Sequence, residues 1–246
     1  MKRGAAPLCL VAVAAACAPT PASTPAPAST LAPAPASALD ALEQRLSSAR
    51  TFRFHARLAT SGRIQSHFEG TVLGGEGGRL RFVFQGAFGG KDVDVLFTSD
   101  GTHMRGGPRG HVFDMDTPPA LRDGTAVEFV RRGLTHDVAR LASGETPDSI
   151  DGTARRHLEM VGPQHLAGER SPGMAGGAAT EAWTWLLYVD HQKAADETLW
   201  LDARTGLPLK RRVVVHFPEG DMEVGEEYDD FVVDGPPETD AFRIEP

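Results

Sequence analysis

The strongest constraint on the fold of this chain is a two-residue alternation of apolar and polar side chains that begins at residue 52. In residues 52–58, which read FRFHARL, every second side chain is apolar and each one between is basic. Such alternation is typical of an antiparallel strand with one face on the core and the other in water. Comparable patterns occur at residues 66–73, 80–84, 92–98, 157–161, 182–189, 197–201, 210–217, 222–228 and 231–233.

The segments between these strands carry turn residues. Glycine dominates residues 74–78, and Asp100-Gly101 is a strong hairpin signal because a type I′ turn requires positive φ angles. Residues 105–150 interrupt the alternation with glycine and proline loops and with two short helical patterns. We therefore expect a helical insertion there, between two β-rich halves.

A further helix is expected immediately before the first strand. Leu39, Leu42 and Leu46 recur at the helical spacing, with Ser37 as the N-cap and Asp40 in the first turn. Antiparallel strands, a leading helix and a helical insertion together predict one curved sheet with the helices against its concave side.

The first 37 residues do not belong to this domain. Residues 1–16 have a basic start, a short apolar run and three alanines at the end, which is the pattern of a signal peptide. Cys17 then opens a segment rich in proline and alanine that extends to residue 37. Such a segment is a semi-rigid spacer that reaches roughly 60 Å in the polyproline conformation. The folded domain is expected at residues 38–246.

Cys17 follows three small residues and so resembles the lipobox of bacterial lipoproteins, although Ala14 stands where these usually carry leucine. The resemblance implies that Cys17 is acylated, with palmitate or a similar chain, and that this lipid anchors the protein in a membrane of the cell envelope. Ala18 is not the aspartate that retains enteric lipoproteins in the inner membrane, which favours the outer membrane, facing the periplasm. The alternative is an ordinary secretory signal with an incidental cysteine.

The charge of the chain argues against nucleic acid as a partner. The formal net charge of −8 becomes about −10 once Lys2 and Arg3 leave with the signal peptide. Both cysteines, Cys9 and Cys17, lie in the N-terminal segment, so we expect no disulfide and no thiol chemistry in the domain.

Motifs for catalysis or metal binding are missing from the sequence. The nine histidines include no HExxH pair, and His55, His67 and His216 fall at strand positions that face solvent. There is no GxSxG or SxxK nucleophile motif. The acidic run at residues 226–230 is interpreted as a charged strand end that guards a sheet edge. We therefore predict no catalytic residue, no metal site and no cofactor, and a hydrolase is only a third hypothesis.

One hairpin resembles a known family. Residues 198–211 read TLWLDARTGLPLKR, which is similar to the W-x-D-x-x-T-G-x-P-x-(K/R) hairpin of the LolA/LolB-like lipoprotein-carrier superfamily. The resemblance implies a mainly β (α+β) fold over residues 38–246, in which a curved antiparallel and unclosed β-barrel wraps over a few helices. It also implies an apolar cavity that takes acyl chains.

Large inward-facing side chains are the candidates for lining that cavity. Trp183 and Trp185 are two residues apart on one strand and so face the same side, whereas the face of Trp200 is not decided by its apolar neighbours. The alternation cannot separate a cavity wall from a solid core. The candidate lining residues are Phe52, Phe54, Leu58, Phe68, Phe82, Phe84, Val95, Trp183, Trp185 and Trp200.

Two functions are compatible with these features. The first is a membrane-anchored bacterial lipoprotein whose half-barrel binds a lipid or a lipoprotein acyl chain, as a carrier or lipid-binding protein. The alternative is a non-enzymatic envelope protein-interaction or sensor module on the same scaffold, with the barrel filled by its own side chains. In that case, the partner is another envelope protein.

Overall fold

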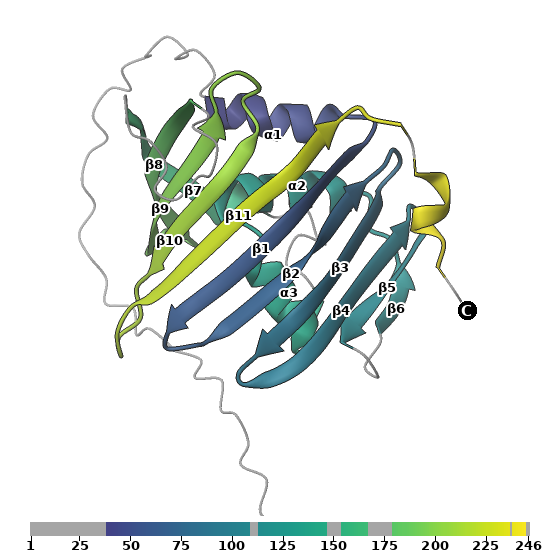
Figure 1. Cartoon of the computed structure of the whole chain (residues 1–246), viewed down its shortest axis with the longest axis horizontal. Helices are drawn as coiled ribbons and strands as arrows, with labels where there is room; N and C mark the ends of the chain where they lie inside the picture. Colours follow the sequence, from purple (N-terminus) through teal and green to yellow (C-terminus); the bar gives the residue numbers. More distant parts are fainter. Residues whose placement is uncertain (1–37, 109–112, 147–153, 167–178, 237, 245–246) are drawn as a thin grey trace, which may run out of the picture. The chain divides into compact units, whose positions relative to one another are not determined.

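A computed structural model describes residues 38–108, 113–146, 154–166, 179–236 and 238–244. Eleven strands in these residues form one sheet in the order β6-β5-β4-β3-β2-β1-β11-β10-β9-β8-β7, and every neighbouring pair is antiparallel (Figure 1). Strands β6 and β7 are its two edges, so the sheet does not close. The predicted mainly β, unclosed fold is confirmed.

The strands are β1 (Phe52–Gly62), β2 (Ser66–Gly74), β3 (Arg79–Phe88), β4 (Lys91–Asp100), β5 (His103–Pro108), β6 (Phe113–Asp116), β7 (Leu158–Leu166), β8 (Thr180–Val189), β9 (Gln192–Asp202), β10 (Pro208–Val215) and β11 (Met222–Val233). The helices are α1 (Ala38–Ser48), α2 (Leu121–Arg131), α3 (Thr135–Ala142), α4 (Ala154–His157) and the short 3-10 helix η2 (Thr239–Phe242). Within the described ranges, no helix has the length and apolar character needed to cross a bilayer.

The sheet consists of two meanders that meet at its centre. Strands β1 to β6 follow one another as neighbours, as do β7 to β11, and the pairing of β1 with β11 joins the two sets. Helices α2, α3 and α4 belong to the connection between the meanders, and in Figure 1 α2 and α3 lie behind the sheet, on its concave side. The region 105–150 thus begins with strand residues of β5 and β6 and continues with α2 and α3.

The core lies between the concave face and the helices. The leucine stripe predicted for α1 is buried there, together with side chains of α2 and α3. From the helices the core takes Leu39, Leu42, Leu46, Leu121, Ala126, Phe129, Val130, Leu134, Val138 and Leu141. On the convex face the intervening positions carry surface ion pairs, such as Arg57 with Asp229 at 2.7 Å and Arg212 with Glu223 at 2.5 Å. His67 and His216 are exposed, as the alternation predicts.

Two glycines let strands β2 and β3 approach unusually closely. A Cβ atom added to Gly86 would lie 1.9 Å from the carbonyl oxygen of His67, and one added to Gly70 would lie 2.1 Å from that of Val83. Both distances are far below any real carbon–oxygen contact. Glycine is therefore required at these positions, where such residues allow a sheet to curl.

The Asp100-Gly101 hairpin forms as predicted, between β4 and β5, but its turn type differs. Only Gly101 has a positive φ, of 99°, so the type I′ prediction was wrong. Glycine at the first central position is the pattern of a type II′ turn. The Asp100 carboxylate accepts hydrogen bonds from the backbone N–H groups of Thr102 and His103, at 2.7 and 2.8 Å.

The acidic run at residues 226–230 does not guard an edge, and that prediction was wrong. Strand β11 lies at the centre of the sheet, where Glu226 and Tyr228 are buried. A bulge follows, in which Asp230 adopts a φ of 53° and the register against β1 shifts. Phe231 then faces the core, and its ring centroid lies 4.5 Å from that of Phe54.

The close approach at Gly86 gives a test of this fold. Replacing Gly86 by Ala should lower the free energy of unfolding by about 3 kcal/mol, because the backbone of β2 must move away. Gly225→Ala is the matched control, since a Cβ there meets no atom within 4 Å. Urea unfolding measures both variants, and an equal effect of the two substitutions would contradict the predicted close contact.

Candidate functional site

The candidate site is the concave face beneath the helix pair α2–α3, where the sheet holds the turn between the helices. Helix α2 ends with the backbone N–H groups of Arg132 and Gly133 both donating to the carbonyl of Glu128, at 2.7 and 3.0 Å. Gly133 has a φ of 87°, in the left-handed region that terminates many helices. Helix α3 begins two residues later, at Thr135.

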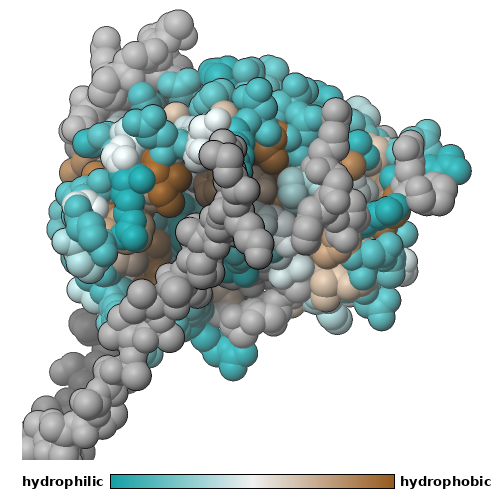
Figure 2. Space-filling model, turned by 90° about the horizontal axis from the view of Figure 1, so that it is seen from below, coloured by the Kyte–Doolittle hydropathy of each residue, from teal (hydrophilic) through white to brown (hydrophobic). Residues whose placement is uncertain are grey.

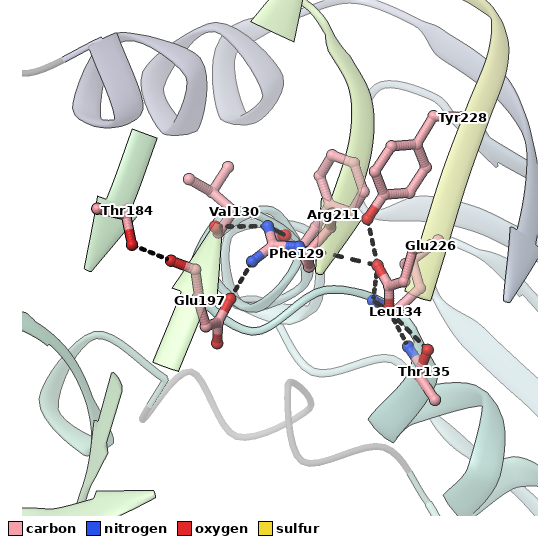
Figure 3. A network of polar contacts seen from close by, with 9 residues as sticks. All are labelled: Phe129, Val130, Leu134, Thr135, Thr184, Glu197, Arg211, Glu226 and Tyr228. Carbon is pink, nitrogen blue, oxygen red and sulfur yellow. Dashed lines mark hydrogen bonds and ion pairs between the residues drawn. The ribbon is translucent and has the colours of Figure 1, made fainter. Parts of the chain in front are cut away.

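Arg211 of β10 binds the C-terminal end of α2. Its side chain is fully buried, and its Nη2 donates to the carbonyls of Phe129 and Val130 at 2.7 Å each (Figure 3). The last carbonyls of a helix have no partner within the helix and carry its negative dipole end. The Arg211 guanidinium donates hydrogen bonds to two of these carbonyls and also places a positive charge at the negative end of the helix dipole.

Glu226 of β11 binds the other side of the same turn. Its carboxylate accepts hydrogen bonds from the backbone N–H of Leu134 at 2.9 Å and from the N–H and hydroxyl of Thr135 at 2.7 Å each. Tyr228 donates a further hydrogen bond from its hydroxyl. A Cβ atom at Gly133 would lie 2.5 Å from the carboxylate, so only glycine allows it this close. The arrangement caps the positive end of α3.

Glu197 of β9 completes the network. One carboxylate oxygen accepts from Arg211, while Oε1 is buried without a hydrogen-bond partner. Burial, with a further contribution from the charge of Glu226, raises the pKa of Glu197 to about 7, although Arg211 opposes the shift. Burial alone would lower the pKa of Arg211, but Glu197, Tyr228 and Glu226 outweigh it and raise that pKa. Arg211 therefore stays charged.

The predicted lining residues are brought together in the core that surrounds this network. Eight of them belong to one contiguous cluster with the helices, namely Phe52, Phe54, Leu58, Phe68, Phe82, Phe84, Val95 and Trp185. Trp183 is only partly buried, and its ring lies 5.1 Å from that of His165. Trp200 is buried but lies outside this cluster, whereas its neighbours Leu199 and Leu201 belong to it, so by alternation Trp200 faces the convex side.

Apart from Trp183, the predicted lining residues are at most 6% exposed. Partly buried side chains such as Phe88, Val93, Phe113 and Met160 continue the core outwards. Figure 2, which views the molecule from below, shows separate apolar patches within a mostly hydrophilic surface. Apolar surface thus reaches solvent at several places, while the central aromatic side chains are covered.

Sequence reasoning missed the four residues that hold the helix turn: Gly133, Glu197, Arg211 and Glu226. For the three charged residues, the only sequence signal is a charge at an inward position of an alternating strand, as for Arg211 two residues before the buried Val213. Among the described residues, no three His, Cys, Asp or Glu side chains converge on a possible metal position. Cys17 lies outside the described residues, so its acylation stays a prediction.

No family model matches the chain, and no curated protein matches it. Several solved structures do. MucB is 19% identical over 85% of this chain with a TM-score of 0.37, and the chain spans only 62% of MucB. The match to a MucA/MucB complex from Pseudomonas aeruginosa has 16% identity and a TM-score of 0.36, and it covers 85% of this chain and 61% of the matched chain. A LolA superfamily protein from Nitrosomonas europaea is 11% identical with a TM-score of 0.37, and the match covers 85% of this chain and 96% of that protein. Neither these identities nor these TM-scores assign a family, a ligand or a partner to the chain.

The raised pKa of Glu197 predicts a specific pH dependence of stability. The unfolded chain titrates near 4.3, so the folded state binds more protons between that pH and about 7. The contribution of Glu197 is fully present below pH 4.3 and is lost as the pH rises through 7. Between pH 5 and pH 8, Glu197→Gln should therefore gain roughly 2 kcal/mol in unfolding free energy relative to the wild type.

Chemical denaturation at the two pH values measures this difference. Glu223→Gln is the control, because Glu223 lies on the exposed face of β11 and pairs with Arg212. Parallel pH profiles for wild type and Glu197→Gln would show that Glu197 is not the titrating group.

Proposed function

We propose that the domain binds an acyl chain or a similarly apolar ligand between the helix pair α2–α3 and the concave face of the sheet. The observation that carries the proposal is the way the helices are held. The polar contacts between these helices and the sheet lie at the α2–α3 turn and at Arg122 and Arg131, whereas the contacts between these positions are apolar. Apolar packing is non-directional, so an acyl chain can replace it.

Binding in this mode requires the helices to move. The predicted lining side chains fill the space beneath α2 and α3 themselves. A ligand must therefore take the place of side chains such as Phe129 of α2 and Leu134 of the α2–α3 turn, which contribute to the same core. Each buried methylene group supplies about 0.8 kcal/mol, so useful affinity needs no catalytic group.

We further propose that the protein acts at a membrane, held there by lipid on Cys17 and kept at a distance by the segment up to residue 37. An outer-membrane position facing the periplasm agrees with Ala18 at the residue after Cys17. In this arrangement the protein is a carrier or lipid-binding lipoprotein rather than an enzyme.

The tight burial of the aromatic side chains favours a second candidate, a protein-interaction or sensor module with a filled core. Phe54, Phe129, Tyr228 and Phe231 form a continuous aromatic cluster, with ring centroids 4.5 to 6.1 Å apart. Such packing stabilises a domain without any ligand. In that case the partner is an envelope protein that binds the outer surface.

Native mass spectrometry of residues 38–246, purified without detergent, separates the two candidates. The first predicts a discrete added mass that solvent extraction identifies as lipid, or saturable binding of a fatty acid added in titration. Gly133→Ala should speed fatty-acid uptake severalfold, because it forces Glu226 away from the helix turn. Gly225→Ala is the control. A bare protein mass with no binding on titration would favour the interaction module.

The anchor is tested separately in the full chain. Replacing Cys17 by Ser should abolish metabolic labelling with palmitate and move the protein from the membrane to the soluble fraction. Replacing Cys9, which lies within the apolar part of the signal, should leave both unchanged. Retention of the Cys17→Ser protein in the membrane would exclude acylation at this residue as the anchor.

A further inference from the structure

The convex side of the sheet carries a second feature, a preformed apolar pocket of about 170 Å³. It lies where β1 begins and where β2 and β11 end, and the segment that follows β11 forms its outer wall. Leu73 and Val232 contribute apolar surface from the strands, and Pro236 and Phe242 contribute it from the C-terminal segment. Phe52 also borders the pocket, but its ring packs in the concave core. In Figure 1 this segment leaves β11 and runs towards the ends of β3 and β4.

Hydrogen bonds fix both walls of this pocket in place. The Asp234 carboxylate accepts from the backbone N–H of Arg50 at 2.7 Å, and the Thr51 hydroxyl donates to the carbonyl of Gly235 at 2.8 Å. Further along, Arg81 donates to the carbonyl of Ala241 at 2.8 Å. The pocket therefore exists before any ligand arrives, and little ordering is needed on binding.

The charged residues that line the pocket are Arg53 and Glu238, and two further arginines, Arg79 and Arg81, lie beside it. Arg53 pairs with Glu238 at 3.0 Å across the opening. The guanidinium of Arg79 lies 5.6 Å from the centre of the Phe242 ring, and Arg81 binds the residue before that ring. Within the described residues, Arg79 and Arg81 donate to the backbone carbonyls of Glu76 and Ala241, and neither forms an ion pair with a carboxylate. Two guanidinium groups beside the pocket are thus available for an acidic partner.

The size of the pocket limits what can occupy it. Sites for drug-sized ligands usually measure about 300–1,000 Å³, whereas a cavity of about 150 Å³ holds a single benzene ring. One leucine or phenylalanine side chain therefore fits, and a lipid does not. Val232 in the pocket lining is 38% exposed, so an apolar group that enters also covers apolar protein surface.

We propose that this pocket docks a protein partner, which inserts one apolar side chain from an acidic segment. The inserted side chain packs between Val232 and Phe242, and flanking carboxylates pair with Arg79 and Arg81. A central apolar anchor with a charged rim is the usual arrangement of a small protein-binding site. The surface is on the opposite face from the acyl-chain site, so this proposal holds or fails independently of that one.

The probe is an acetylated and amidated peptide of sequence Glu-Glu-Leu-Glu-Glu, titrated into the full chain and followed by NMR. We expect saturable shifts confined to residues around the pocket, with a Kd of about 0.1–1 mM that weakens severalfold on adding salt. Peptides with glycine in place of leucine, or with lysine in place of glutamate, should not bind. Absence of saturable binding by the acidic leucine peptide overturns the proposal.

Matched variants test the position of the site. Val232→Trp should fill the pocket and weaken binding at least tenfold, whereas Val161→Trp, at a 42% exposed valine on β7, should not. Arg79→Gln leaves the apolar wall in place and should reduce both affinity and salt dependence. Equal binding by Val232→Trp and the wild type overturns the proposal. A third outcome also overturns the proposal: the peptide does not bind, but anionic phospholipid vesicles do, and Val232→Trp abolishes the vesicle binding. The pocket would then be a membrane-binding surface.

Discussion

The position of the helices in this domain depends on one cross-strand pair of opposite charges. Arg211 and Glu226 are direct register partners on β10 and β11, and both point into the concave side. The turn between α2 and α3 presents a negative helix end and a positive helix end beside each other. Arg211 binds the negative end of α2 and Glu226 binds the positive end of α3, so these charges favour one orientation of the helix pair on the sheet. Apolar packing alone would not specify it.

Arginine side chains that bind free backbone carbonyls or a buried carboxylate also attach α2 to α1. Arg122, in the first turn of α2, donates to the carbonyls of Leu46 and Ala49 at the end of α1 and to the carbonyl of Gly75 in the β2–β3 turn. At the other end of α2, Arg131 pairs with the buried Glu43 at 2.6 Å. Arginine thus satisfies the free carbonyls at the ends of both helices. Because each buried guanidinium is costly to desolvate, these contacts contribute more to the specificity of the arrangement than to net stability.

The face of each strand could be predicted from the sequence, because alternation decides which side chains point inward. That reasoning placed Phe54, Phe84 and Trp185 correctly. It failed for Glu226, since a charged run was assigned to a sheet edge. The partners that make an inward glutamate stable are the N–H groups of Leu134 and Thr135, about ninety residues earlier in the chain. Periodicity within a strand carries no information about such distant partners.

The hairpin at residues 198–211 shows the opposite case, in which the residues of the sequence motif are sufficient to account for the turn that they form. The Asp202 carboxylate accepts from the backbone N–H of Arg204 at 3.0 Å and from the N–H and hydroxyl of Thr205 at 2.7 and 2.9 Å. These hydrogen bonds, those to the Thr205 backbone above all, lower the pKa of Asp202. Gly206 then supplies a φ of 66°. All the partners lie within five residues, so the spacing of the motif is sufficient to predict the turn.

For the proposed acyl-chain binding, the balance of polar and apolar contacts sets how large a ligand must be to open the concave site. Moving the helix turn removes the hydrogen bonds that Arg211 and Glu226 make to it, whereas Glu197 and Tyr228 stay beside them on the sheet. A hydrogen bond to a charged group contributes about 1.5–3 kcal/mol. At about 0.8 kcal/mol for each buried methylene group, roughly two to four methylenes only offset the loss of one such hydrogen bond. Opening is therefore unfavourable for short apolar molecules and becomes favourable only for a chain well beyond that length. In the proposed binding mode, the hydrogen bonds from the buried charges to the helix turn thus set a threshold on the length of the acyl chain.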